Sequence, residues 1–426
     1  MITENTKKSD FDLTGKRVIV VGGGASGLIA AGEAAKAGAT TILLEKKIQT
    51  GRKLAITGKG RCNLTNSAPL EEFLEAFGPN GRFLRQAFMQ FFNTELVGFI
   101  EELGVKIDLE RGGRFFPVDN RAEDIALALE NWAKAAKVEI QTGRAVDELL
   151  IENERVAGVQ SGRQKRIEAD AVIVATGGRS YPGTGSTGDG YRLAEAVGHT
   201  LVPTRPALVP IETAGTVAKA LQGLSLKNVS LKFLVDGKEQ DKALGEMLFT
   251  HFGMSGPLIL HLSGQIVDAL ELRKKVVLSL DLKPAVSEKK LEARLLREFT
   301  ANGNKQLQNI LKELLPAKMI PVCLDLLDLP IDLNGNQVTT DERRRLRHWL
   351  KDFSFEVTGH RPIAEAIITA GGVNLKEIDP RSMESQLIPG LYFAGEVLDL
   401  NGPTGGYNLQ AAFSTGWLAG RSAAGA

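Results

Sequence analysis

Residues 18–27 of the chain read VIVVGGGASG. The β-branched run at 18–21 is typical of a strand that is buried on both faces of a sheet. A glycine turn follows at 22–27, then an alanine-rich helical stretch at 28–37, then a second β-type run at 40–44 that is closed by Glu45. This order of strand, GxGxxG turn, helix, strand and acidic residue predicts a βαβ unit that binds a dinucleotide.

Each part of the turn has a physical role in that prediction. Gly22 permits the tight turn, Gly24 lets a pyrophosphate approach the backbone, and Gly27 lets the helix pack closely on the strand. The start of the helix presents free N–H groups and a partial positive charge to the phosphates. Glu45 lies where a carboxylate can accept hydrogen bonds from ribose hydroxyls.

The composition excludes several classes of protein. The chain has 426 residues, of which 43% are hydrophobic and 24% charged, so it is globular and not disordered. Its length predicts two or three domains. The 46 glycines occur in clusters and not at every third position, which excludes collagen. The net charge of +1 gives no global electrostatic reason to expect nucleic acid as a partner.

The compartment and the metal content are predicted from a few residues. Two cysteines, Cys62 and Cys323, cannot make a disulfide framework, and the polar N-terminus has no signal-peptide core. The apolar stretch 18–31 is too short and too rich in glycine to cross a bilayer. The five histidines show no paired ligand spacing. We therefore expect a cytoplasmic enzyme that binds neither membrane nor metal.

Two distant segments repeat the combination of strand, glycine and acid. Residues 169–176 form a buried β-type run that ends in ATGG, and residues 390–396 read GLYFAGE. A glycine-rich loop at 402–408 and a helical stretch at 409–419 follow. Glu396 at the end of its strand can reach the ribitol hydroxyls of a flavin. A helix that starts near Asn408 would aim its positive end at the isoalloxazine ring.

Three longer strings carry a family resemblance: GRKLAITGKGRCNLTN at 51–66, TGGRSYPGTGSTGDG at 176–190 and GPTGGYNLQ at 402–410. Together with the glycine turn, ATGG and LYFAGE, they resemble the YhiN/BaiN-like (aminoacetone oxidase-like) group of FAD-dependent oxidoreductases. That group is similar to the two-dinucleotide-binding-domain flavoproteins of the glutathione-reductase type. The likeness extends over residues 18–421. One departure is Lys59, which occupies a place where many members have glycine.

The resemblance implies the fold and its division into domains. The fold class is α/β: a Rossmann-like FAD-binding domain of the glutathione-reductase type with an inserted β-barrel-like plus helical domain. The FAD-binding domain would comprise residues 13–200 and 355–426. The insert would comprise a β-rich part at 201–285, which contains β-type runs at 229–235 and 275–280, and a helical part at 286–354.

The resemblance also implies noncovalently bound FAD. Ala25, Ser26 and Glu45 would hold the pyrophosphate and the adenosine ribose, and Val146 would give backbone contacts to the adenine. The expected FAD-binding residues are Gly22, Gly24, Ala25, Ser26, Gly27, Glu45, Lys46, Arg52, Lys53, Thr57, Gly58, Gly60, Arg61, Cys62, Asn63, Val146, Thr176, Gly177, Gly395, Glu396, Gly406, Asn408 and Leu409.

Four residues are candidates for catalysis. His251 lies in a glycine-punctuated loop and could donate a proton, and Arg361 could anchor a carbonyl or carboxylate of the substrate. Arg61 and Tyr407 lie within the family strings. Each of the four also has a plain structural interpretation, as does Cys62, which could be a small buried thiol inside the flavin loop.

The electron donor has no evident domain of its own, because the chain contains a single GxGxxG. The string at 183–190 lacks a preceding strand and the Lys-Ser/Thr pair of a P-loop, so it does not predict a second nucleotide-binding site. It is interpreted either as a turn near the flavin or as a mobile lid. NAD(P)H would therefore dock transiently at the flavin.

The resemblance implies reduction of a conjugated C=C bond in a small molecule by hydride transfer from flavin N5. Two alternatives stay open: reduction of uridine in ribosomal RNA bound through the insert, and oxidation of an amine or aminoketone. The basic run at 343–351 favours RNA slightly, although its apolar stripe also fits the solvated face of a packed helix. The sequence does not identify the substrate.

Overall fold

A parallel sheet of five strands carries the glycine turn, in the order β19-β10-β1-β2-β6. The computed structural model describes residues 15–162 and 165–426, so the expected domain start at 13 lies outside them. At the centre of the sheet, β1 (Arg17–Val21) pairs with β10 (Ala171–Val174) on one side and with β2 (Thr40–Glu45) on the other. Val18 to Val21 are buried, as expected for a strand that is covered on both faces.

The parallel arrangement places four functional turns at one edge of the sheet. The glycine turn follows β1, Glu45 ends β2, and the ATGG string follows β10. Gly395 and Glu396 come directly after β19 (Leu391–Phe393). In an open parallel sheet, ligands bind outside the carboxyl ends of the strands. This edge is therefore where a dinucleotide would be held.

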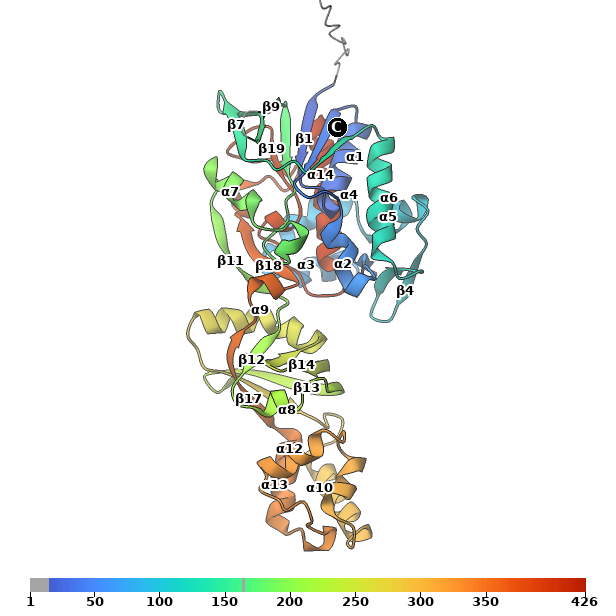
Figure 1. Cartoon of the computed structure of the whole chain (residues 1–426), viewed down its shortest axis with the longest axis vertical. Helices are drawn as coiled ribbons and strands as arrows, with labels where there is room; N and C mark the ends of the chain where they lie inside the picture. The colour runs from blue at the N-terminus through green and yellow to red at the C-terminus, as the bar shows by residue number, and fades with distance from the viewer. Residues whose placement is uncertain (1–14, 163–164) are drawn as a thin grey trace, which may run out of the picture. The chain divides into compact units, whose positions relative to one another are not determined.

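Two helices pack against each other beside this sheet, namely α1 (Ala25–Lys36) and α14 (Tyr407–Ala424). Their backbones approach closely because glycine occupies the contact: a Cβ on Gly416 would lie 2.3 Å from the carbonyl oxygen of Ser26, and a Cβ on Gly420 would lie 2.3 Å from that of Ala30. The contact fixes the N-termini of both helices relative to each other (Figure 1).

The chain divides into two units, one formed by residues up to 205 together with 368–426 and the other by residues 206–367. Three short sheets, β3-β5-β4, β7-β8-β9 and β11-β18, and several helices complete the first unit. Its remaining elements are α2 (Arg52–Gly60), β3 (Thr65–Asn66), α3 (Leu70–Ala76), α4 (Arg85–Gln90), α5 (Asn93–Glu102), β4 (Ile107–Glu110), β5 (Arg114–Pro117), α6 (Ala122–Ala135), β6 (Glu139–Thr142), β7 (Glu148–Glu152), β8 (Arg155–Ser161), β9 (Lys165–Glu168), α7 (Asp189–Ala196), β11 (Leu201–Ala207) and β18 (Ile368–Val373).

The second unit contains a closed six-stranded barrel, β12-β15-β14-β13-β16-β17, with a hydrophobic core of its own. Its strands are β12 (Ile211–Thr213), β13 (Ser225–Val235), β14 (Lys238–Phe249), β15 (Gly253–Ser255), β16 (Val276–Asp281) and β17 (Phe353–His360). Its helices are α8 (Val217–Ala220), α9 (Pro257–Glu271), α10 (Glu288–Ala301), α11 (Leu307–Ile310), α12 (Met319–Leu326) and α13 (Thr340–Lys351) (Figure 1).

The predicted fold class is confirmed, with a Rossmann-type sheet and an inserted barrel with helices. Some details differ from the sequence prediction. The expected return to the FAD-binding domain at 355 falls inside β17, which is a barrel strand because it pairs with β12 and β16. The expected β-rich part of the insert also contains α9, a helix of 15 residues whose Leu258, Ile259 and Leu262 are buried in the core of the second unit.

Candidate functional site

The glycine turn after β1 has the geometry that its spacing predicts. Gly22 has a φ of +105°, and a Cβ there would lie 2.6 Å from the carbonyl oxygen of Ala175. A Cβ on Gly27 would lie 1.8 Å from the carbonyl oxygen of Gly22, so α1 can pack this closely on the turn only with glycine. Gly24 begins α1 without a side-chain cap, and a Cβ there would meet nothing within 4 Å. The start of α1 therefore offers both N–H groups and open space to an anion.

Glu45 is fixed at the same edge by backbone donors. Its Oε2 accepts a hydrogen bond from the N–H of Gly23 at 2.8 Å, and its Oε1 accepts one from the N–H of Lys47 at 2.7 Å. The carboxylate is therefore oriented beside the turn and keeps further lone pairs for hydroxyl groups. Ser26 directs its hydroxyl to the carbonyl of Ala394 at 3.4 Å, so what it can offer a ligand is its backbone N–H.

The family string at 51–66 forms α2 and the turn behind it. The helix is interrupted at Thr57, and both Gly58 and Lys59 adopt left-handed conformations, with φ of +57° and +60°. The conformation of Lys59 explains why glycine suits this position. Cys62 follows with a φ of +55°, is fully buried, and has its pKa raised to about 12 by burial. Its thiol therefore stays protonated at neutral pH.

An ion pair joins α2 to the end of β19. The Nζ of Lys53 lies 2.5 Å from Oε2 of Glu396 and 2.6 Å from the hydroxyl of Ser180. The other carboxylate oxygen of Glu396 accepts hydrogen bonds from Ser180 Oγ at 3.0 Å and from the N–H of Thr369 at 2.8 Å. Glu396, which is expected to bind ribitol, is thus held by three partners from three separate segments.

The C-terminal glycine loop is organised by Asn408. Its Oδ1 accepts a hydrogen bond from the N–H of Gly402 at 2.8 Å, and its Nδ2 donates to the carbonyls of Gly402 and Pro403. The side chain of Asn408 therefore makes these hydrogen bonds within the loop. The helix α14 begins at Tyr407, two residues before the expected start at 409, and Gly406 is its N-cap. Asn63 reaches this point from the first family string, with its amide between the carbonyl of Thr65 and the N–H of Gly406.

The residues at this edge fit a flavin dinucleotide. Among residues 15–162 and 165–426, few buried side-chain polar atoms have no hydrogen-bond partner, and one of them, Thr176 Oγ1, lies two residues after the end of β10 at this edge. Buried polar atoms normally have partners. A ligand with hydroxyl and phosphate groups would supply them, while the two helix N-termini would face its anionic parts.

The other expected FAD contacts lie on the same unit. Gly177 and Gly395 follow β10 and β19 with φ of +71° and +78°. The carbonyl of Val146 accepts a hydrogen bond of 3.5 Å from Arg192. Sequence reasoning did not identify Ser180 and Thr369, which hold Glu396. Ser180 lies within the string at 176–190 and could have been found there, whereas Thr369 belongs to no motif.

Two catalytic candidates lie on the unit that carries the glycine turn. The guanidinium of Arg61 is placed over the ring of Phe116 at 4.2 Å and binds Asn120 and Glu110. Tyr407, in the first turn of α14, packs on Phe73 with ring centres 4.4 Å apart. Burial raises the pKa of Tyr407, assisted by Glu72, so its hydroxyl is protonated at neutral pH.

The other two candidates, His251 and Arg361, lie together on the barrel unit. The Nη1 of Arg361 is 2.9 Å from Glu212, its Nη2 is 2.6 Å from Glu365, and its guanidinium lies over the ring of Phe252 at 4.7 Å. These hydrogen bonds raise the pKa of Arg361 further. His251 is exposed and contacts the same ring edge-on. A substrate carboxylate at Arg361 would compete with two carboxylates of the protein.

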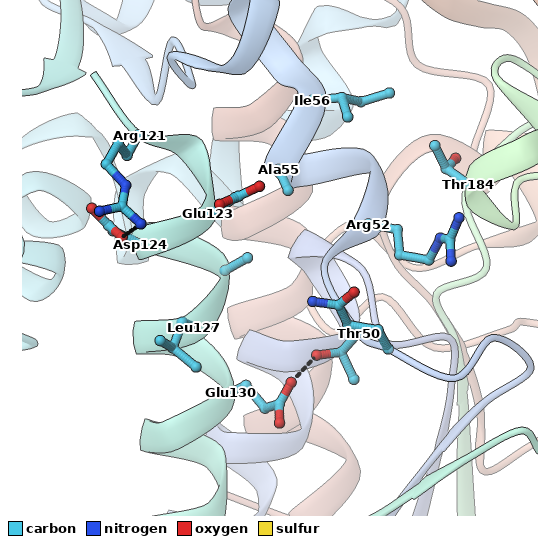
Figure 2. Close-up of a pocket in the computed structure, with 12 residues that line it drawn as sticks. Thr50, Arg52, Ala55, Ile56, Arg121, Glu123, Asp124, Leu127, Glu130 and Thr184 are labelled. Atoms are coloured by element: carbon cyan, nitrogen blue, oxygen red, sulfur yellow. Dashed lines mark hydrogen bonds and ion pairs between the residues drawn. The ribbon is translucent and has the colours of Figure 1, made fainter. Parts of the chain in front are cut away.

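A pocket of about 510 Å³ opens between α2 and α6. Figure 2 shows Glu123 of α6 pointing toward Ala55 of α2, and Arg52 extending toward Thr184. Thr50 donates a hydrogen bond to Glu130 at 2.5 Å across this pocket. Its lining residues are Gln49, Thr50, Arg52, Ala55, Ile56, Arg121, Glu123, Asp124, Ala126, Leu127, Glu130 and Thr184.

The described residues were compared with the requirements of a metal site and of a membrane-spanning helix. Within residues 15–162 and 165–426, no group of three His, Cys, Asp or Glu side chains could hold a metal ion. Among the helices of the same ranges, none combines the length and apolar character that a bilayer crossing requires.

Comparison with known proteins gives consistent matches along the chain. A family model described as HI0933-like protein Rossmann domain matches residues 16–422. The 3-dehydro-bile acid delta(4,6)-reductase of Clostridium scindens is 32% identical over 410 residues, which cover 96% of this chain and 99% of that protein. A protein of Escherichia coli named ribosomal RNA dihydrouridine synthase is 29% identical over 407 residues, which cover 94% and 96%.

A solved structure shares the fold at low sequence identity. The 3-ketosteroid-delta4-(5alpha)-dehydrogenase of Rhodococcus jostii has a TM-score of 0.52 and 16% identity, with 98% of each chain covered. The match of the family model over almost the whole chain confirms the resemblance that the three strings indicate. The chain belongs to the HI0933-like family and is an FAD-dependent oxidoreductase.

Proposed function

We propose that this protein reduces a C=C bond conjugated to a carbonyl group in a small molecule, with NAD(P)H as the electron donor. The observation that carries the proposal is the likeness over 96% of the chain to a protein named as a delta(4,6)-reductase of 3-dehydro-bile acids. A steroid acid with a 3-oxo group and a neighbouring C=C bond is therefore the substrate class to test.

In this proposal the edge of the parallel sheet holds FAD, which supplies the hydride when it is bound. The first turn of α1 would bind the pyrophosphate through backbone N–H groups, and Glu45 would accept hydrogen bonds from the adenosine ribose. Glu396, oriented by Lys53 and Ser180, would accept hydrogen bonds from the ribitol chain. The N-terminus of α14 would stabilise negative charge that develops on the ring system.

The reaction also requires a proton for the carbon next to the carbonyl and a hydrogen-bond donor for the carbonyl oxygen. Tyr407 suits the donor role, because a tyrosine hydroxyl is protonated at neutral pH and this one stands at the start of α14. Arg61 would act from the same unit. Arg361, which lies with His251 on the barrel unit, is already neutralised by Glu212 and Glu365 and is therefore the weaker candidate for binding a substrate carboxylate.

A second candidate function is reduction of uridine in RNA, which the name of the Escherichia coli relative favours. The basic helix α13 argues against RNA binding at that place. Arg343 and Arg347 bind Glu292 at 2.6 and 3.1 Å, while Arg344 and Arg345 lie within ion-pair distance of Asp341. Arginines that are compensated in this way contribute little positive potential for phosphates.

One experiment separates the candidate functions. The purified flavoprotein is reduced anaerobically by light and then mixed with a 3-oxo-Δ4 steroid acid or with uridine-containing RNA, while the flavin absorbance is recorded. In a separate anaerobic sample the oxidised flavoprotein is mixed with an amine, and bleaching of the flavin there would indicate amine oxidation. Fast reoxidation by the steroid acid supports the proposal. Reoxidation by RNA but not by the steroid acid would support the second candidate function instead. Reduction of the enzyme by NADH or NADPH in the dark identifies the donor.

We also propose that the protein works in the cytoplasm. Cys62 and Cys323 are free thiols, and cysteines without disulfide bonds are typical of proteins in a reducing compartment. Cell fractionation with an antibody against the native protein tests this location.

A further inference from the structure

The family string at 176–190 forms a loop whose two ends meet. The N–H of Gly188 donates a hydrogen bond to the carbonyl of Gly178 at 3.1 Å, so residues 178–188 close on themselves. Ser180 and Ser186 are buried near the ends of the loop, whereas Tyr181, Pro182 and Gly183 are exposed at its tip. We refer to residues 178–188 as the strap.

The strap is attached to the sheet edge at three points. Near its start, Ser180 binds Glu396 at 3.0 Å and Lys53 at 2.6 Å. In its middle, the carbonyl of Gly183 accepts a hydrogen bond of 3.4 Å from Arg52. At its end, Lys46 lies 2.5 Å from Thr187 Oγ1 and 2.6 Å from Oδ2 of Asp189, which follows the strap as the first residue of α7.

The positions of these attachments follow from the strand order. Glu396 lies at the end of β19 and Lys46 lies directly after β2, and the order β19-β10-β1-β2 places three strand intervals between them. The two ends of the strap meet beside Glu396, whereas its middle reaches the β2 side: a Cβ on Gly185 would lie 3.3 Å from Cγ of Lys47 and 3.6 Å from Cε of Lys46. The strap therefore extends from the end of β19 toward the end of β2, and β1 with its glycine turn lies between them.

The attachment at Lys46 contains an ion pair between the sheet edge and the residue that follows the strap. The side chains of Lys46 and Asp189 are only 23% and 36% exposed, and Thr187 also donates to Asp189 at 3.0 Å. Burial alone would raise the pKa of Asp189, but the hydrogen bonds from Lys46 and Thr187 lower it, so the ion pair persists at neutral pH.

Strain at the tip supports a functional role for the strap. Tyr181 adopts a left-handed conformation with φ of +50° and ψ of 58°, although it is an aromatic residue on the surface. Such strain in a bulky residue persists where the surroundings impose it and is concentrated at ligand clamps and switch regions.

We propose that the strap lies across the bound dinucleotide and that the Lys46–Asp189 ion pair is its latch, so that FAD enters and leaves only when this latch opens. The inference rests on the proposed FAD site. A latch of this kind slows association and dissociation together, whereas a residue that merely contacts FAD changes the dissociation rate alone.

The test uses Asp189→Asn, which keeps the shape of the side chain and removes its charge. Release of FAD is followed by its fluorescence after dilution of the holoprotein, and binding by mixing the apoprotein with FAD. We expect both rate constants to rise about tenfold, with a much smaller change in Kd. Thr187→Val should raise both by a smaller factor, because it removes one partner of Lys46 and leaves the charges in place.

Asp236→Asn is the matched control, since Asp236 forms an exposed ion pair with Lys274 at 3.3 Å on the barrel unit. It should leave both rate constants unchanged. Unchanged rates in Asp189→Asn, or a rise in the dissociation rate alone, would overturn the latch while leaving the FAD site intact. If the wild-type protein binds no FAD, the proposed function fails, and this outcome is distinct from failure of the latch.

Discussion

The ammonium group of Lys53 lies 2.5 Å from the carboxylate of Glu396, a residue 343 positions further along the chain. The pair connects the first turn of α2 with the end of β19, and both side chains are largely buried, at 23% and 19% exposed. Because Ser180 and Thr369 bind the same carboxylate, Glu396 has one orientation at the sheet edge.

Glu396→Gln should weaken FAD binding. The amide loses the charge-assisted bond to Lys53 and half of its acceptor capacity, which predicts a rise in Kd of about tenfold. Fluorescence titration of the apoprotein with FAD measures the change. Glu168→Gln is the control, because Glu168 forms an exposed ion pair with Arg17 at 3.3 Å. If both variants bind FAD with the same Kd, Glu396 does not contribute to the FAD site.

Glu45→Ala should lower both FAD affinity and stability. The substitution leaves the N–H groups of Gly23 and Lys47 without their acceptors, at a cost of about 1–3 kcal/mol for each donor that stays buried. Thermal unfolding with and without added FAD separates the two effects. Glu45→Gln retains one acceptor oxygen and should lie between the wild type and Glu45→Ala. A variant Glu45→Ala that retains FAD like the wild type would contradict the assigned role.

Gly416→Ala should separate α14 from α1, whose N-termini we propose to face FAD. The new Cβ would lie 2.3 Å from the carbonyl oxygen of Ser26, and overpacking of this kind costs about 1–3 kcal/mol. Since α1 and α14 would both shift, FAD affinity should fall with the melting temperature. Gly98→Ala in α5 is the control, because a Cβ there meets nothing within 4 Å. That variant should be neutral or slightly more stable.

Lys59→Gly should stabilise the protein. Lys59 has a left-handed backbone with φ of +60°, which costs a residue with a side chain about 1 kcal/mol and costs glycine nothing. Part of this gain is offset by the greater freedom of glycine in the unfolded chain. We expect the melting temperature to rise by a degree or so, without loss of FAD. Lys59→Ala retains the Cβ and should show no rise; an equal rise there would disprove the backbone explanation.

His199 should make the protein sensitive to acid. It is fully buried, with Nδ1 2.9 Å from Glu377 and Nε2 2.9 Å from the hydroxyl of Ser385. Burial lowers its pKa below the ordinary value of about 6.5, against the opposing effect of Glu377. The folded state therefore binds this proton only at a lower pH than the unfolded state does. The contribution of the neutral His199 to the free energy of unfolding is fully present above about pH 6.5. It is lost as the pH drops toward the lowered pKa of the folded state.

Melting temperatures between pH 5 and 8 test this dependence. His199→Gln should show a flatter profile than the wild type, because it has no proton to gain in this range. The exposed His348 provides the control, and His348→Gln should keep the wild-type slope. Identical slopes for wild type and His199→Gln would show that His199 does not determine the acid sensitivity.

Local patterns were sufficient to predict much of the fold. The buried run at 18–21, the glycine spacing at 22–27 and the acid at 45 predicted β1, α1 and β2, because strand burial and helix starts depend on neighbouring residues. The start of α14 was placed two residues too late, since Gly406 provides its N-cap where a longer loop was expected. Helix α9 was missed inside a stretch of β-type runs.

The sequence by itself determined that the chain has a dinucleotide-binding sheet of the FAD type, because the turn, its strands and the three family strings are each contiguous. Only the tertiary structure decided which distant charged groups meet. Lys53 with Glu396, Lys46 with Asp189, and Arg361 with Glu212 are pairs separated by more than a hundred residues. No periodicity relates such residues, and an ion pair forms only where the packing of distant elements brings two charges within a few ångströms.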